Sequence, residues 1–194
     1  MKIKIPKSGR NKALFVIDVQ PNTLNAKAAG TSHIIRATIK ATGYPFYALA
    51  TYYADSQSML FKQSKWSLSR EEAGATDEKI ISAVAGKNAP VMHLTKSGRS
   101  AFKCEQRPAL LESLKALAIE EIHIVGYDIN DCVLATAYDA IDLGFYTYVI
   151  EEACNHYAGD ENLVAAAIKV LRQQNMTNNS SLFEFEEICV ASGN

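Results

Sequence analysis

Short, almost continuous apolar runs alternate along this chain with segments of helical periodicity, and this alternation restricts the fold more than any other feature. The first run, ALFVIDV at Ala13–Val19, has no polar face, which is typical of a strand buried on both sides of a parallel sheet. Four further runs of this kind are bounded by turn residues: Pro45–Tyr53, Ala89–Lys96, Glu121–Tyr127 and Phe145–Ala153. A last, weakly alternating strand is expected in SLFEFEEICVAS.

The segments between these runs predict helices. RPALLESLKALA has a proline suited to a first turn and a single stripe of leucines, and CVLATAYDAIDLG and DENLVAAAIKVLRQQ carry comparable stripes. Thr31–Thr42 is a weaker helix, and the polar stretch Phe61–Ala75 predicts an irregular, lid-like insertion. Strands that alternate with helices favour right-handed crossovers. We therefore predict a three-layer α/β/α fold, with a mainly parallel six-stranded sheet and helices on both faces.

Length and charge narrow the class of protein further. A chain of 194 residues that is 48% hydrophobic fits one domain, covering residues 1–194. Its 20 basic and 21 acidic residues almost cancel, so we expect neither nucleic acid nor a membrane surface as a partner. There is no signal-peptide pattern and no bilayer-spanning run. The four cysteines form no CxxC pair, which favours reduced thiols in a cytoplasmic protein.

Three reactive side chains are predicted where strands end. Asp18 and Lys96 each follow a strand, and Cys132 opens the helix after the fourth strand. Ligands of an open parallel sheet bind at this edge. Taken alone, Cys132 is most simply an inert buried thiol, but a helix N-terminus lowers the pKa of a thiol. Together the three residues favour a unit in which Asp18 takes the thiol proton and Lys96 stabilises the anions.

The segments ALFVIDVQ, LTKSGRSAF and VGYDINDCVLATAYDAIDLGF, taken in order, give the chain a resemblance to the isochorismatase-like cysteine hydrolases. That family includes nicotinamidases, N-carbamoylsarcosine amidases and ureidoacrylate amidases, and the match runs from about Ala13 to Ala153. The resemblance implies a Rossmann-like fold and a catalytic triad of Asp18, Lys96 and Cys132.

The resemblance has further implications for the loop before the cysteine. It implies a cis peptide bond between Tyr127 and Asp128, and an oxyanion hole formed by the backbone N–H groups of Asp128 and Cys132. The loop also departs from the family, because most relatives have a small residue and a threonine where this chain has Asp128 and Ile129.

A second departure concerns metal. Nicotinamidases carry an aspartate and histidines as metal ligands after the second strand. The corresponding stretch here, ATYYADSQSMLFKQSKW, contains Asp55 and no histidine. We therefore expect no metal and no cofactor.

Residues directly after the first strand, near the second strand and in the loop after Lys96 are candidates for a substrate pocket. Aromatic walls suit a flat or small apolar substrate, although core packing is an equal interpretation for the tyrosines. Arg99, in the loop after Lys96, has two interpretations: it pairs with a substrate carboxylate, or it is a solvated surface residue. The predicted substrate-binding residues are Gln20, Tyr52, Tyr53, Phe61, Trp66 and Arg99.

Retention of Cys132 favours acyl transfer: hydrolysis of a small amide, carbamoyl or ureido C–N bond through a thioester. Two alternatives stay open. One is an isochorismatase-type vinyl ether hydrolase in which the cysteine is unused. The other is a catalytically silent member that acts as a binding subunit, because Asp128 disfavours a neighbouring thiolate. The resemblance also implies a homo-oligomer, a dimer or a tetramer.

Overall fold

The computed structural model describes residues 2–24, 29–54, 56–64, 68–180 and 184–190. Its strands are β1 (Lys2–Pro6), β2 (Lys12–Ile17), β3 (Phe46–Tyr52), β4 (Val91–Lys96), β5 (Glu121–Gly126), β6 (Tyr146–Cys154) and β7 (Phe185–Cys189). Its α-helices are α1 (Ala29–Ala41), α2 (Met59–Ser64), α3 (Arg70–Ala73), α4 (Glu78–Ala85), α5 (Arg107–Ala116), α6 (Leu134–Asp142) and α7 (Glu161–Gln173). A 3₁₀ turn (Ala101–Lys103) and a π-helical turn (Ile129–Val133) complete the described elements.

The central sheet confirms the predicted fold class. Its order is β4-β3-β2-β5-β6, and every neighbouring pair is parallel. The chain builds outward from β2 through β3 to β4, then returns to the other side of β2 for β5. The sheet therefore has a topological switch point between β2 and β5, where the loops that follow the two strands diverge.

The predicted number of strands in this sheet was wrong by one. Within the described residues the central sheet has five strands, and the last strand, β7, pairs antiparallel with β1 in a separate two-stranded sheet. β7 has only half-buried and exposed side chains, whereas β2 is buried on both faces, so β7 does not suit a central position. The stretch Phe61–Ala75, expected to be irregular, contains parts of α2 and the whole of α3.

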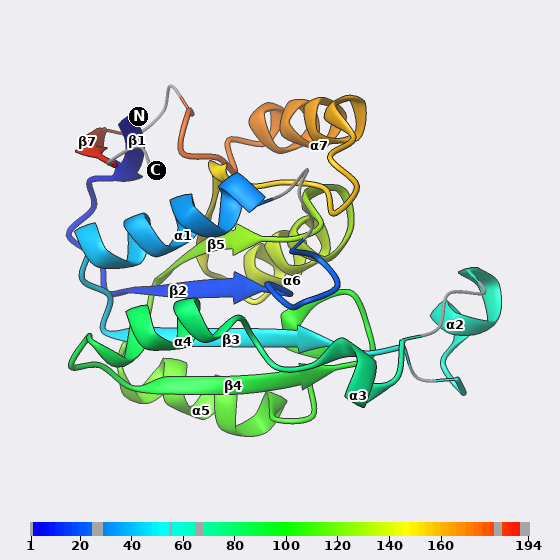
Figure 1. Cartoon of the computed structure of the whole chain (residues 1–194). Coiled ribbons are helices and arrows are strands. Elements are labelled where there is room, and N and C mark those ends of the chain that lie inside the picture. The colour runs from blue at the N-terminus through cyan, green and yellow to red at the C-terminus, as the bar shows by residue number, and fades with distance from the viewer. Residues whose placement is uncertain (1, 25–28, 55, 65–67, 181–183, 191–194) are drawn as a thin grey trace.

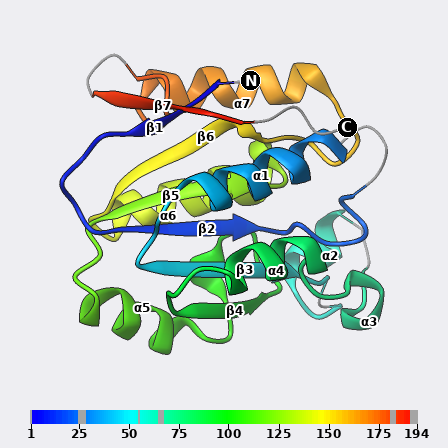
Figure 2. The same cartoon turned by 60° about the vertical axis from the view of Figure 1, so that its left-hand side comes forward.

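Alternate residues of β2 serve two cores. Phe15 and Ile17 pack toward α5, α6 and α7, whereas Leu14 and Val16 pack toward α1, α4 and the small β1–β7 sheet. Figures 1 and 2 show the resulting layers, with α1 and α4 on one face of the sheet and α5 and α6 on the other. Among the described residues, no helix is long and apolar enough to cross a membrane.

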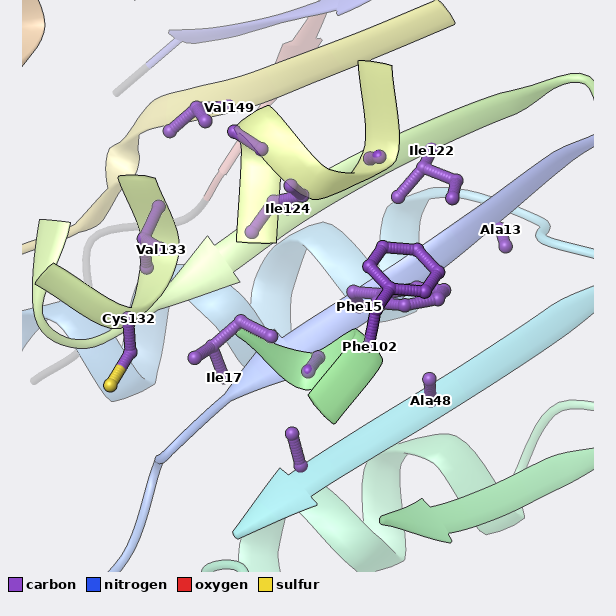
Figure 3. Close-up of a cluster of buried hydrophobic side chains, with 14 of the residues drawn as sticks. Ala13, Phe15, Ile17, Ala48, Phe102, Ile122, Ile124, Cys132, Val133 and Val149 are labelled. Carbon is purple, nitrogen blue, oxygen red and sulfur yellow. The ribbon is translucent and has the colours of Figure 1, made fainter. Parts of the chain in front are cut away.

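The end of β5 must be a glycine. Gly126 has a φ of 122°, a conformation that L side chains rarely adopt, and a Cβ there would lie 2.1 Å from the backbone oxygen of Ile17. This close approach of β5 to β2 starts the loop that leads to Cys132. Figure 3 shows Cys132 at the end of the larger core cluster, beside the arrowhead of β5.

Candidate active site

Asp18, Lys96 and Cys132 meet at the carboxyl edge of the central sheet. The Lys96 Nζ lies 2.7 Å from the Asp18 Oδ2 and 3.3 Å from the Cys132 Sγ. Lys96 has no exposed surface, and Asp18 and Cys132 are 4% and 8% exposed. Three residues separated by up to 114 positions in the chain thus form one buried cluster.

Asp18 follows β2 directly and is held in an unusual backbone conformation. Its φ is 51°, in the left-handed region, and the Thr23 Oγ1 donates a hydrogen bond to its carbonyl oxygen at 2.7 Å. Lys96 binds Oδ2, but Oδ1 is buried without a hydrogen-bond partner in the described part of the chain. One oxygen of the carboxylate is therefore fixed, and the other is available to accept a proton.

Cys132 lies in the π-helical turn that leads into α6, after the Tyr127–Asp128 peptide bond, which is cis. The Cys132 carbonyl accepts a hydrogen bond from the Thr136 Oγ1 at 2.7 Å, and the same hydroxyl oxygen accepts one from the Ala101 N–H at 3.0 Å. Ala101 belongs to the loop after β4. This pair of bonds therefore couples the position of the cysteine to the loop that follows Lys96.

Burial dominates the electrostatics of the cluster. It raises the pKa of the Cys132 thiol well above its ordinary value, against the opposing attraction of the Lys96 ammonium. This differs from the expectation that a helix N-terminus lowers that pKa, because desolvation outweighs the local dipole. Burial also raises the pKa of Asp18. For Lys96, burial works to lower the pKa, but attraction to Asp18 and Cys132 raises it overall.

The cluster opens into a cavity of about 140 Å³. Its wall includes Asp18 and Cys132, and it is completed by residues from the end of β3, from the loops after β2, β4 and β5 and from α2: Gln20, Asn22, Thr23, Tyr52, Leu60, Ser64, Arg99, Tyr127, Asp128 and Asp131. A wider cavity of about 430 Å³ shares Asn22, Thr23, Asp128 and Asp131 with it and adds Leu68 and Tyr157. The two cavities therefore adjoin along this shared wall.

The predicted substrate-binding residues divide into several groups. Tyr52 and Arg99 line the cavity, and the ring of Tyr52 lies 4.8 Å from the Lys96 Nζ. Gln20 also lines it, but its amide is engaged by the backbone: Oε1 accepts from the Tyr52 N–H, and Nε2 donates to the carbonyls of Tyr52, Ala73 and Gly74. Gln20 therefore holds the wall of the cavity in position.

Tyr53 and Phe61 take other places, outside the described wall of the smaller cavity. The Tyr53 hydroxyl donates to Glu105, and the Arg70 guanidinium lies 4.2 Å from the centre of its ring. Phe61 packs against a small cluster that includes Leu68 and Ala73. Trp66 and Asp55 lie outside the described residues. In the described part of the chain, no group of three or more His, Cys, Asp or Glu side chains is arranged to hold a metal ion.

Two acidic residues of the wall were not predicted as substrate contacts. Asp131 forms an ion pair with Arg99. The Asp128 Oδ1 accepts a hydrogen bond from the Tyr157 N–H at 2.7 Å, and its Oδ2 lies 4.0 Å from the His156 Nε2. Burial raises the pKa of Asp128 to about 6. The sequence marked the backbone of Asp128, through the expected cis bond and oxyanion hole, but only the departure from the family pattern marked its side chain.

Comparisons with known proteins bear on the family and the fold of the chain. A family model described as the isochorismatase domain matches residues 12–180. No curated protein is significantly similar to the chain. Among solved structures, the nicotinamidase/pyrazinamidase PncA of Bacillus subtilis has a TM-score of 0.68 at 20% identity, with 90% of this chain and 100% of that chain covered.

Two further solved structures show how widely this fold is used. The N-carbamoylsarcosine amidase of Thermoplasma acidophilum has a TM-score of 0.61 at 18% identity, covering 75% of this chain and 84% of that one. The MAR1 ribonuclease of Caenorhabditis elegans has a TM-score of 0.60 at 21% identity, covering 92% and 79%. At these identities the likeness shows the fold, and the reaction has to be argued from the site.

Proposed function

The chain belongs to the isochorismatase family, a family of hydrolases, and from this premise we propose that it hydrolyses a small amide, carbamoyl or ureido C–N bond through a thioester on Cys132. One observation carries the proposal. A single buried ammonium, that of Lys96, contacts both a carboxylate and a thiol at the wall of a cavity. This arrangement suits a nucleophile that must be activated only when a substrate is present.

The first half of the reaction begins from a neutral thiol, because burial raises the pKa of Cys132. As Sγ bonds to the substrate carbonyl carbon, the thiol proton passes to the unpartnered Oδ1 of Asp18. The carbonyl oxygen becomes an oxyanion, which we assign to the backbone N–H groups of Asp128 and Cys132. Lys96 stabilises the negative charge that develops on sulfur, since its Nζ lies 3.3 Å away.

The second half restores the enzyme. The tetrahedral intermediate expels the amine, which takes the proton from Asp18, and a thioester remains on Cys132. Water then attacks the thioester carbonyl while Asp18 accepts one of its protons. The carbon–sulfur bond breaks, the sulfur regains a proton from Asp18, and a carboxylic or carbamic acid leaves.

The test is a panel of small amides, carbamoyl compounds and ureas, assayed for the release of ammonia or amine. We expect turnover by the unaltered chain and a loss of about 10³-fold or more in Cys132→Ala and in Asp18→Asn, because each variant lacks a group that acts on the reacting atoms. Cys189→Ala is the matched control, since Cys189 is exposed on β7, and it should retain full activity.

Mass spectrometry of the acyl-enzyme separates this proposal from its two alternatives. A substrate-sized adduct on Cys132 during turnover supports the thioester route. Turnover that persists in Cys132→Ala would instead favour a vinyl ether hydrolase with an unused cysteine. If the whole panel is inert and no adduct forms, the silent binding subunit becomes the better explanation.

A further inference from the structure

The carboxylates in the walls of the two cavities do not all have a cationic partner among the described residues. Asp18 is paired with Lys96, and Asp131 is paired with Arg99, so each of these carboxylates has a strong cation beside it. Asp128 has no lysine or arginine partner among the described residues, and its Oδ2 lies 4.0 Å from the imidazole Nε2 of His156. Among the described residues, one carboxylate of the cavity wall therefore has no lysine or arginine beside it.

Asp128 stands where a substrate passes from one cavity to the other. It lines both the smaller cavity, which contains Cys132, and the wider cavity of about 430 Å³. Its Oδ1 is held by the Tyr157 N–H, which fixes the carboxylate, while Oδ2 makes no hydrogen bond in the described part of the chain. A bound molecule that reaches Cys132 thus meets a fixed carboxylate with one oxygen available.

The surroundings of that oxygen favour a positive charge. The Tyr157 side chain, 48% exposed, lines the wider cavity next to Asp128, and an aromatic ring beside a carboxylate is a common arrangement for binding a cationic nitrogen. A substrate carboxylate would instead meet the charge of Asp128. Arg99, the candidate for binding such a carboxylate, is engaged by Asp131.

We propose that Asp128 is a specificity-determining residue that selects substrates with a positively charged nitrogen, such as an ammonium, amidinium or guanidinium, a short distance from the scissile carbonyl. This inference rests on the proposed function, because it names the substrate class for that same site. The acyl carbon lies at Cys132 and the cationic group lies against Asp128 and Tyr157, at the opening to the wider cavity.

The test uses three amides of similar length: γ-aminobutyramide, which is cationic, valeramide, which is its neutral isostere, and succinamate, which is anionic. Calorimetry on Cys132→Ala protein measures binding without turnover, and kcat/KM is measured on the protein with Cys132 intact. We expect the cation to bind about tenfold more tightly than valeramide and succinamate to bind most weakly. In Asp128→Asn the ratio between the cationic and the neutral amide should fall to about one.

Matched variants separate the charge from the fold. Asn at position 128 keeps an oxygen that accepts the Tyr157 N–H, and Asp128→Ala serves as a second variant that also removes the charge. Asp142→Asn removes the same charge at the far end of α6, where Asp142 is exposed, and should leave the preference for the cation intact.

Three results would overturn this inference: equal affinity for γ-aminobutyramide and valeramide, a preference for the cation that survives in both Asp128 variants, or no binding of any cationic probe. Binding in the Cys132→Ala background does not depend on catalysis. A protein that binds cations through Asp128 but hydrolyses nothing would therefore refute the proposed function and leave this inference standing.

Discussion

At the scale of single residues, Lys96 is the group on which the site depends. Its ammonium is fully buried, which is tolerated because Asp18 and Cys132 lie within 3.3 Å and the Gly98 carbonyl lies at 3.4 Å. The Coulomb attraction is mutual. Removing either charge therefore leaves the other buried without compensation, which costs more than the intact pair contributes.

Lys96→Met should separate the electrostatic role of the amine from its bulk. Without the ammonium Asp18 loses the strongest interaction that opposes the effect of its burial, so the pKa of its carboxyl rises further and the protonated form is favoured. We expect amide turnover to fall by about 10²-fold or more and the free energy of unfolding to fall by about 3 kcal/mol. Assays on the amide panel and urea titrations check both.

The double variant Asp18→Asn with Lys96→Met is the control for that experiment. It removes both charges, so most of the lost stability should return while activity stays absent. A single Lys96→Met variant with unchanged stability and activity would contradict the role given to the ammonium.

The sequence was sufficient to select the three clustered residues, but it did not predict the protonation behaviour of each. Asp18, Lys96 and Cys132 could be selected because all three follow strands of one parallel sheet, and topology brings such positions to a common edge. The pKa of Cys132 could not be predicted, because it depends on how deeply the packing encloses the sulfur. The pairing of Arg99 with Asp131 likewise joins two loops whose proximity no local pattern encodes.

At the scale of secondary-structure elements, Gln20 connects the loop after β2 to β3 and α3. Its side-chain oxygen accepts the Tyr52 N–H at 2.7 Å, and its amide nitrogen donates to the Tyr52 and Ala73 carbonyls at 3.2 and 3.1 Å. These bonds satisfy backbone groups at the point where β3 leaves the sheet. They hold Tyr52, and with it one wall of the smaller cavity.

Gln20→Ala should loosen this connection. The buried Tyr52 N–H loses its acceptor and carbonyl groups lose their donor, so we expect a loss of about 2 kcal/mol in the free energy of unfolding and a higher KM. Hydrogen exchange at Tyr52 and urea titration measure the effect. Gln174→Ala, which removes one bond to Tyr138 on the surface, should change neither quantity. Unaltered exchange at Tyr52 would rule out the connection.

The central strands were predictable and the short elements were not. β2, β3 and β5 are buried on both faces, so their sequences are continuous apolar runs. Such strands can be recognised without knowing which strands they pair with. β1 was missed because its partner, β7, lies at the other end of the sequence, and only that pairing makes it a strand. α2 has no buried residue, so its sequence lacks the apolar stripe by which a helix is recognised.

At the scale of the whole molecule, a second buried polar network lies at the opposite edge of the sheet from the candidate active site. The His123 Nε2 lies 2.7 Å from Glu121 and its Nδ1 lies 2.9 Å from the Tyr44 hydroxyl. Burial lowers the pKa of His123. Burial works to raise the pKa of Glu121, but His123, with smaller contributions from Ser8 and Lys12, lowers it overall. These shifts fix a neutral imidazole that donates to a carboxylate and accepts from the tyrosine.

This network should make the stability of the fold depend on pH. The unfolded chain binds a proton at His123 near its ordinary pKa of 6.5, whereas the folded chain resists protonation until lower pH. Stability is therefore fully present above about pH 6.5 and falls as pH drops below it, by at most about 1.4 kcal/mol per pH unit for this one group. Urea titrations between pH 7.5 and about 5 measure the slope.

His123→Gln should flatten that slope, because the amide does not titrate and can still bond to Glu121 and Tyr44. His93→Gln is the control, since His93 is exposed on β4 and should leave the slope unchanged. An identical slope in His123→Gln and in the unaltered chain would show that other groups set the acid sensitivity.

The pairing of β1 with β7 places Lys2 opposite Cys189, so the strands at the two extremes of the chain are hydrogen-bonded neighbours. The first and the last described strands therefore lie side by side. A short linker could join those extremes, and the backbone could be reopened at the exposed turn between α4 and β4, which gives a circular permutant with the same sheet order. The folding of such a permutant would test whether the order of the elements along the chain affects the final fold.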